Sequence, residues 1–349
     1  MRIAGTGSAF PPYYHSQEEL SAALKAKWAP KMKNPDVLDR MLSRVGVDGR
    51  HLSLPMMDYY GLDTWGKAND AWIRVATEIG EKALCRALTN AGVQPQDLDA
   101  IYFVSVTGIC SPSIDARLVN RMGLPARIKR VPIFGLGCVA GAAGISRAAD
   151  YVRGFPEHTA ALLSVELCSL TLQQEDLSMA NIISAGLFGD GAGAVVVTGA
   201  KRESSGPEIL ATRSSFYKDT EDAMGWNVSE KGFHIVLSPA VPQIVIDHLA
   251  QDVDAFLNEQ GLRRSDISSW IMHTGGPKVL EATATALEVP REALEVSWEC
   301  LRKVGNLSSA SVLLVLDEFM NRKRPESGTY SILAAMGPGF CAELLLLRW

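Results

Sequence analysis

Cys138 is the first residue of this sequence whose type and position suggest chemistry. It stands in the stretch FGLGCVAGAAG, where an apolar strand pattern gives way to a run of small residues typical of a helix start. A free thiol has a pKa of about 8.5, so a cysteine nucleophile needs help to ionise at neutral pH. A helix N-terminus supplies at most about 1.5 pKa units, and a neighbouring imidazole would have to take the proton for the remainder.

Two further polar residues, His273 and Asn306, are candidates for the same site. His273 ends the strand pattern SWIMH, at the kind of strand edge where α/β proteins build their sites, and Asn306 precedes LSSAS. Taken singly, each residue has an ordinary structural interpretation. A free cysteine usually packs in the core, a lone histidine is usually satisfied there, and an asparagine before a helix is usually its cap. Chemistry therefore requires that the fold bring the three side chains together.

A weak internal repeat supports that requirement. Residues 88–103 (LTNAGVQPQDLDAIYF) match residues 257–272 (LNEQGLRRSDISSWIM), and the glycine-rich stretch GCVAGA lies over GNLSSA further along the same frame. A third match joins GDGAGAVVV to GPGFCAELL. Because the three matches occur in the same order, they indicate one α/β unit used twice, with halves at 1–200 and 201–349.

The repeat predicts where the candidate residues lie. If the halves pack about a pseudo-twofold axis, Cys138 and Asn306 occupy equivalent places, each just after a glycine at a helix start. They would then face each other at the centre of the molecule, with His273 beside them. The small residues after Cys138 would let the helix start approach the other half closely and keep the site dry.

Helix and strand signals alternate along the chain, which predicts the α/β class. Ser16 and Glu19 form a capping-box pattern before a helix at 19–28. A second helix pattern follows Asn34-Pro35 and is closed by Gly46, and a third runs over 70–92. The clearest strand patterns after these are AIYFVSV, AALLSVE, GAVVVTG, SWIMH, YSILAAM and AELLLLRW.

Composition excludes several classes of protein. The 349 residues are 47% hydrophobic and 21% charged, as expected of a soluble globular chain with a large core. A net charge of -5 without any basic run argues against nucleic-acid binding. No apolar window reaches the roughly 20 residues of a membrane span, and the N-terminal apolar run is too short for a signal peptide, so a cytoplasmic protein is expected. The six cysteines form no CxxC pair, which argues against a zinc site or disulfide framework.

Six motifs then occur in a recognisable order: GCVAGA, ELCSLT, LFGDGAGA, HTGGP, GNLSSAS and MGPGF. In this order the chain resembles a bacterial type III polyketide synthase of the chalcone-synthase-like family, from about Ile3 to the C-terminus. The resemblance implies a thiolase-like fold, with two similar α/β halves in α-β-α-β-α layers, and a homodimer. It also implies acyl-CoA and malonyl-CoA as substrates, without a metal or flavin cofactor.

The resemblance assigns roles to the three polar residues. Cys138 matches the nucleophile that takes the acyl group from acyl-CoA. His273 and Asn306 match the pair that holds the malonyl thioester carbonyl while carbon dioxide leaves. The resulting enolate attacks the acyl group on the cysteine and lengthens the chain by two carbons.

Further positions match more loosely. Phe188 and Phe233 resemble two aromatic gates, although either could be a core residue, and Thr171 and Ser308 match pocket and support positions. The basic pair that would bind the phosphates of CoA is Arg40 and Arg44, four residues apart on one predicted helix face, for which a solvated surface is the alternative.

The sequence departs from the plant pattern in ways that concern the product. In SVTGICSP a large methionine that crosses the dimer is replaced by Ser111, with Cys110 beside it. Ala335 and Met336 stand where glycine and phenylalanine are usual. Together with the stretch AMGW, these departures resemble enzymes that accept long acyl chains, which predicts alkylpyrone or alkylresorcinol products.

Two other functions remain open at this stage. A ketoacyl-carrier-protein synthase that initiates fatty-acid synthesis shares Cys, His and Asn, but it would need a basic docking face for an acidic carrier, and none stands out in the sequence. A non-catalytic thiolase-like partner protein is the second alternative, against which the intact Cys138, His273 and Asn306 speak.

Overall fold

The computed structural model describes all 349 residues and contains one nine-stranded sheet, in the order β11-β12-β13-β8-β1-β7-β6-β4-β5. The strands of its first part are β1 (Arg2–Ala9), β4 (Ala100–Val104), β5 (Lys129–Ile133), β6 (Thr159–Leu167) and β7 (Asp190–Thr198). The strands of its second part are β8 (Glu208–Phe216), β11 (Ile267–Met272), β12 (Tyr330–Gly337) and β13 (Cys341–Arg348). The parts join through a single residue pair between β1 and β8, Arg2 with Glu208.

The two parts of the sheet have the same topology, which confirms the internal repeat. In the first part β4 runs parallel to β6, while β6–β7 and β7–β1 are antiparallel. In the second part β11 runs parallel to β12, while β12–β13 and β13–β8 are antiparallel. Strands β1, β4, β6 and β7 therefore correspond to β8, β11, β12 and β13, and β5 has no counterpart. The change from one set to the other falls between Thr198 and Glu208.

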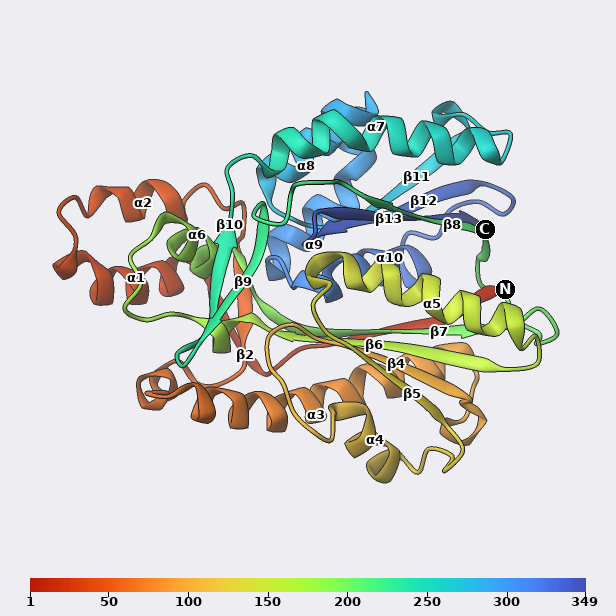
Figure 1. Ribbon diagram of the computed structural model, residues 1–349, viewed down its shortest axis with the longest axis horizontal. Helices are drawn as coiled ribbons and strands as arrows, with labels where there is room; N and C mark the ends of the chain where they lie inside the picture. The colour runs from red at the N-terminus through yellow and green to blue at the C-terminus, as the bar shows by residue number, and fades with distance from the viewer.

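Helices complete a five-layered α-β-α-β-α arrangement (Figure 1). Helices α5 (Ala140–Gly154) and α10 (Ser311–Asn321) lie between the two parts of the sheet. The outer faces are covered by α3 (Trp65–Ala91) and α4 (Ile114–Met122) on one side, and by α7 (Val241–Glu259) and α8 (Pro277–Leu287) on the other. Helix α9 (Glu295–Val304) leads into α10. This is the thiolase-like architecture predicted from the sequence.

A smaller lobe projects beside the layers (Figure 1). It contains helices α1 (Gln17–Trp28), α2 (Asp36–Leu42) and α6 (Met179–Leu187). Two short hairpins lie next to these helices: β2 (Tyr13–Ser16) with β3 (Gly49–Leu52), and β9 (Met224–Ser229) with β10 (Gly232–Leu237). None of the helices is both long and apolar enough to cross a membrane.

Local sequence signals account for most helix ends. Ser16 and Glu19 form the predicted capping box, in which each side chain accepts a hydrogen bond from the other residue's backbone N–H. Helix α3 ends at the predicted place, where Gly92 adopts the left-handed conformation with a φ of 65°. It begins earlier than predicted, because Thr64 caps it. Helix α2 was predicted to run to Gly46 but ends at Leu42.

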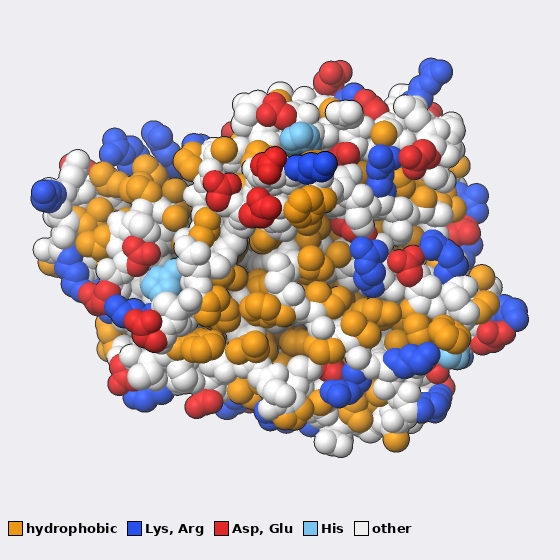
Figure 2. Space-filling view, in the orientation of Figure 1, with side chains coloured by type: hydrophobic (Ala, Val, Ile, Leu, Met, Phe, Trp, Pro, Cys, Tyr) orange, Lys and Arg blue, Asp and Glu red, His pale blue; other side chains and the backbone are white.

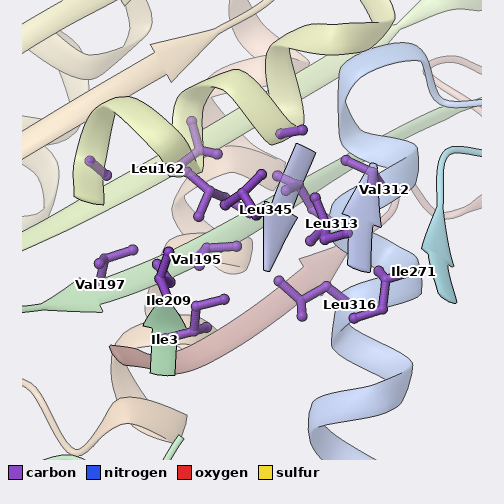
Figure 3. Packing of buried hydrophobic residues seen from close by; sticks show 14 of the residues in the cluster. Ile3, Leu162, Val195, Val197, Ile209, Ile271, Val312, Leu313, Leu316 and Leu345 are labelled. Atoms are coloured by element: carbon purple, nitrogen blue, oxygen red, sulfur yellow. The ribbon is translucent and has the colours of Figure 1, made fainter. Parts of the chain in front are cut away.

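The small residues of α5 allow its first turn to lie directly against the other half of the molecule. A Cβ atom on Gly141 would stand well under 3.0 Å from the backbone oxygen of Ser309, and one on Gly144 would overlap the side chain of Leu162. Figure 3 shows the apolar core that continues from this contact, to which Leu162 of β6, Leu345 of β13 and Val312 of α10 all belong. Side chains from both halves therefore share one core.

The contact at Gly141 yields a test of this packing. We expect Gly141→Ala to destabilise the protein by about 1 to 3 kcal/mol, because the added methyl group overlaps backbone that belongs to another element. Gly154→Ala, in the same helix with no atom near its Cβ position, should instead stabilise by at most about 1 kcal/mol. Urea unfolding midpoints compare the two variants, and equal effects would contradict the proposed close approach.

Candidate active site

Cys138 lies in a 3-10 turn, Gly137–Val139, immediately before α5. The residue is buried, with 5% of its surface exposed, and its Sγ is 3.6 Å from the hydroxyl oxygen of Ser308. Ser308 belongs to the equivalent turn before α10, Ser308–Ala310. The thiol of one half therefore contacts a side chain of the other half.

The two turns correct the predicted register of the repeat. Gly137 and Ser308 both adopt positive φ angles, 53° and 47°, and each lies three residues before the first residue of α5 or α10. Structurally, Cys138 therefore corresponds to Ser309 and not to Asn306. The sequence comparison aligned the glycine before Cys138 with Gly305, but in the second half the turn begins three residues after that glycine.

Asn306 is held by backbone and side-chain hydrogen bonds. Its N–H donates to the Leu187 carbonyl at 3.0 Å, and its carbonyl accepts from the Gly189 N–H at 2.9 Å. The side-chain oxygen accepts from the N–H of Ser308 at 2.7 Å and from the hydroxyl of Ser311 at 3.3 Å. Because the amide oxygen is occupied as an acceptor, the NH2 group is the part of this side chain that can bind a substrate oxygen.

His273 directly follows β11, where its N–H donates to the Ala334 carbonyl of β12 at 3.0 Å. The side chain is buried, and Nδ1 has no hydrogen-bond partner in the protein. Burial lowers the pKa of the imidazole to about 4. The ring is therefore neutral at physiological pH and acts as a hydrogen-bond donor or acceptor without a charge.

His273 and Asn306 line one cavity, which we call the catalytic cavity. Its other walls are largely apolar and include Phe188, Met224, Val279, Met336 and Phe340. Cys138 is not among the lining residues, but it reaches the same region through Ser308, two residues after Asn306. The fold thus places two hydrogen-bond donors in a mostly apolar cavity, and the turn after Asn306 contacts the buried thiol.

Comparison with known proteins identifies the family. Residues 51–201 match the model for the N-terminal domain of chalcone and stilbene synthases, and residues 208–349 match the model for their C-terminal domain. The chain belongs to the chalcone and stilbene synthase family. Within that family it is a type III polyketide synthase, as its relatives and structural neighbours show.

Two of its relatives are bacterial enzymes. The chain is 48% identical over 350 residues to 1,3,6,8-tetrahydroxynaphthalene synthase of Streptomyces peucetius subsp. caesius, covering 99% of this chain and 93% of that protein. It is 33% identical to phloroglucinol synthase of Pseudomonas fluorescens, covering 97% of both. The crystal structure of 1,3,6,8-tetrahydroxynaphthalene synthase from Streptomyces coelicolor A3(2) superimposes with a TM-score of 0.95 at 32% identity, covering 100% of this chain and 99% of that one.

In this synthase the thiol is not activated as the sequence suggested. Burial raises the pKa of Cys138 to about 12, the Glu166 carboxylate adds to the rise, and the hydrogen bond with Ser308 only partly opposes it. The sequence predicted that an imidazole and a helix N-terminus would favour ionisation of this thiol. His273, however, is neutral and makes no hydrogen bond to the thiol, and the helix start lies deep in the protein. Burial therefore favours the neutral thiol over the thiolate.

Glu166 is a buried acid that the sequence reasoning missed. It lies on β6 and accepts hydrogen bonds from the Val106 N–H at 3.1 Å, the Thr107 hydroxyl at 2.9 Å and the hydroxyls of Ser105 and Ser309. Burial raises its pKa to about 7, although these hydrogen bonds lower it. The signal was a single carboxylate inside the continuous apolar strand AALLSVEL.

Phe188 separates the catalytic cavity from a second one, which we call the α1 chamber. The chamber has a volume of about 120 Å³. Thr171 lines it, with its hydroxyl bonded to the Cys168 carbonyl at 2.8 Å, and the Cys168 side chain lines it too. The remaining walls are mainly apolar and include Leu20, Ala23, Leu24, Leu52, Leu172, Trp226 and Ile235.

Phe233 lines neither of these two cavities. It is buried, and its ring packs against those of Trp65, Phe134 and Trp226, with centroids 5.8 to 6.2 Å apart. It borders a separate cleft near Thr64. This placement favours the core-packing interpretation of Phe233 over that of a gate.

Ser111 and Cys110 lie in the loop after β4, outside both cavities. Ser111 is exposed and Cys110 is half-buried. Asn69 fixes this loop by exchanging two hydrogen bonds with the backbone of Ile109, at 2.8 and 2.9 Å. Within one chain, these residues do not reach the site.

Arg40 and Arg44 are both exposed and form no ion pair. Because α2 ends at Leu42, Arg44 lies beyond the helix, and the two side chains do not share a helical face as predicted. Gly46, just after them, packs against Pro277 in the segment that follows His273. Gly46, two residues after Arg44, therefore lies near the loop that leads to the catalytic cavity.

The buried neutral imidazole leads to a pH prediction. Between pH 6.5 and about 4 the unfolded chain binds a proton at His273 that the folded chain does not. Protonation therefore favours the unfolded chain in this range, and the folded protein loses stability as the pH falls below 6.5. His273→Gln removes this pH dependence. From pH 7 to pH 4 the natural protein should lose up to about 3 kcal/mol of unfolding free energy relative to the variant.

Urea unfolding of both proteins at several pH values measures that difference. Glu166 titrates in both proteins, and because its folded pKa is raised, its contribution runs in the opposite direction. Subtracting the two curves removes it. A difference that stays constant with pH would show that the imidazole is not buried in its neutral form.

Proposed function

We propose that this synthase carries an acyl chain on Cys138 and extends it with malonyl units that lose carbon dioxide in the catalytic cavity. The observation that supports the proposal is the placement of the Asn306 amide and the neutral His273 imidazole on one apolar cavity, next to the turn that contacts Cys138. This pair provides hydrogen-bond donors without a charge. Such donors stabilise a developing oxyanion most strongly where water is excluded.

The condensation follows from these donors. The malonyl thioester carbonyl accepts hydrogen bonds from Asn306 and His273, the bond to the carboxylate breaks, and carbon dioxide leaves. The electron pair of that bond moves onto the thioester as an enolate, whose oxygen the two donors stabilise by a few kcal/mol each. The enolate carbon then attacks the acyl carbon on Cys138, a carbon–carbon bond forms, and the thiolate leaves. No step needs a metal ion or flavin, so we retain the expectation that neither takes part.

The position of the basic pair supports CoA thioesters as the substrates. Arg40 and Arg44 are solvent-exposed cations without partners, close in sequence to Gly46, which packs on the loop after His273. Phosphates of CoA bound there would place the thioester end toward Gly275 and Val279, which line the catalytic cavity.

The relatives favour a particular starter. The naphthalene and benzene rings named for the tetrahydroxynaphthalene and phloroglucinol synthases carry oxygens on alternate carbons, the pattern left by two-carbon units joined head to tail. We therefore propose malonyl-CoA as both starter and extender, and a polyhydroxylated aromatic product. The long acyl starter predicted from the sequence is the second candidate, and the apolar walls of the α1 chamber favour it.

We also propose that two copies of the chain associate through β5, which fits the homodimer predicted from the sequence. This strand is at the edge of the sheet, and four of its five residues are exposed. Exposed apolar side chains, Ile109, Val131 and Phe134, lie on β5 and on loops next to it. Figure 2 shows hydrophobic side chains gathered in a band across the face that includes α5. The cytoplasmic location stays a prediction.

The reaction is tested with purified enzyme, malonyl-CoA alone, and malonyl-CoA with a ladder of acyl-CoA starters. We expect aromatic products from malonyl-CoA alone, without a carrier protein, as measured by mass spectrometry. Cys138→Ala should carry no covalently bound acyl group, because the variant lacks the only proposed attachment atom. An acyl group still bound to this variant would refute the assignment, and strict dependence on long-chain starters would select the second candidate.

The interface is tested by the mass of the assembly in solution. Phe134, which is 51% exposed, should be covered in the dimer, so Phe134→Asp is expected to weaken association at least tenfold. Met57, which is 73% exposed and belongs to the 3-10 helix Met56–Gly61, provides the control Met57→Asp. Sedimentation equilibrium compares the two variants. A natural protein that is monomeric at micromolar concentration would contradict the proposed dimer.

A further inference from the structure

The turn that carries Phe188 is held at both ends by residues of one segment, 50–53. Strand β3 supplies Arg50, whose guanidinium donates hydrogen bonds to the carbonyls of Ala185 and Gly186 in the last turn of α6. Ser53, just after β3, donates to the Asp190 carboxylate at 2.5 Å, where β7 begins. The residues between these anchors therefore have little freedom to shift.

Those residues also bind the backbone of the catalytic asparagine. The Leu187 carbonyl accepts from the Asn306 N–H, and the Gly189 N–H donates to the Asn306 carbonyl. Gly189 lies so close to Val304 that a Cβ atom there would stand under 3.0 Å from the Val304 carbonyl oxygen. The position of Asn306 thus depends on the segment 185–189, and this segment depends on Arg50.

Arg50 is suited to this task by its charge and shape. It is 3% exposed and forms no ion pair, and it also donates to the side-chain oxygen of Gln17 at 2.7 Å. Carbonyl groups at a helix C-terminus carry partial negative charge, so the cation is stabilised where it binds. A planar guanidinium can hold two adjacent carbonyls at once, which the single ammonium group of lysine does less well.

We propose that Arg50 is a positioning residue for the condensation reaction: by fixing the C-terminal end of α6, it sets the Asn306 amide at the distance from His273 that malonyl decarboxylation requires. The inference rests on the proposed function, since it assigns Asn306 to that step. Arg50 acts through the backbone of 185–189 and touches no reacting atom.

The proposal separates two half-reactions. Loading of an acyl group requires Cys138, whose turn is not bonded to Arg50, whereas decarboxylation of malonyl-CoA requires Asn306. Arg50→Ala should therefore lower the ratio of the decarboxylation rate to the loading rate at least tenfold. Arg50→Lys should give an intermediate ratio. Millimolar guanidinium, added to Arg50→Ala, should restore part of the lost decarboxylation.

Arg264, which is half-buried, offers a control for the loss of a guanidinium that binds a helix C-terminus. It binds the carbonyls of Ala286 and Leu287 at the C-terminal end of α8 in the same way, and it also pairs with Asp254. Arg264→Ala should also destabilise the protein, because it loses hydrogen bonds to helix carbonyls and the pair with Asp254, but it should leave the ratio of the two rates unaltered. A general loosening of the protein would lower the ratio in both variants alike.

The outcomes distinguish this inference from the proposed function. A ratio equal to that of the natural enzyme in folded Arg50→Ala or Arg50→Lys would overturn the positioning role while leaving the reaction intact. If Arg50→Ala does not fold, Arg50→Lys alone decides. If the natural enzyme neither loads an acyl group nor releases carbon dioxide from malonyl-CoA, the proposed function itself fails.

Discussion

The close approach of two helix starts at the centre of the molecule is the constraint on which the rest of the structure depends. Helix α5 meets the turn before α10 with no side chain between them, because Gly141 leaves room for the Ser309 backbone. That contact brings Cys138 of the first half within reach of Ser308 of the second. Without it, a chain built from two similar units would have two separate helix ends and no shared site.

Burial at this centre determines the electrostatics more than charge pairing does. The thiol of Cys138, the carboxyl of Glu166 and the imidazole of His273 all have pKa values shifted toward the neutral form, and burial is the largest cause for each. In a largely uncharged site no fixed anion opposes the transfer of negative charge from the malonyl carboxylate to the enolate oxygen. Hydrogen-bond donors already in place then need no reorganisation to stabilise it.

Sequence reasoning predicted the α/β class and its duplication because their signals are local or repeated, whereas the family and the thiolase-like fold came from the resemblance of six motifs. The capping box at Ser16, the left-handed glycine after α3 and the two matching α/β patterns each arise from short-range physics or duplication. The predicted register of the repeat was wrong by three residues near Asn306. The sequence comparison aligned two glycines, whereas the equivalent positions are those with the same backbone conformation, and φ angles cannot be read from a sequence. The missed partnership of Glu166 with Ser309 joins residues 143 positions apart, which no local pattern encodes.

Ser308 adopts a strained backbone conformation that its role beside Cys138 explains. In the first half the left-handed position before the helix is filled by glycine, which adopts it freely, but in the second half it is filled by serine at a φ of 47°. A side chain in that region carries strain of about 1 kcal/mol or more. Its hydroxyl is the hydrogen-bonding partner of the Cys138 sulfur, so a glycine there would relax the backbone and leave the sulfur without it. In this chain a relaxed backbone at position 308 and a hydrogen-bonding partner for the sulfur cannot both be had, because the first requires glycine and the second requires a side chain.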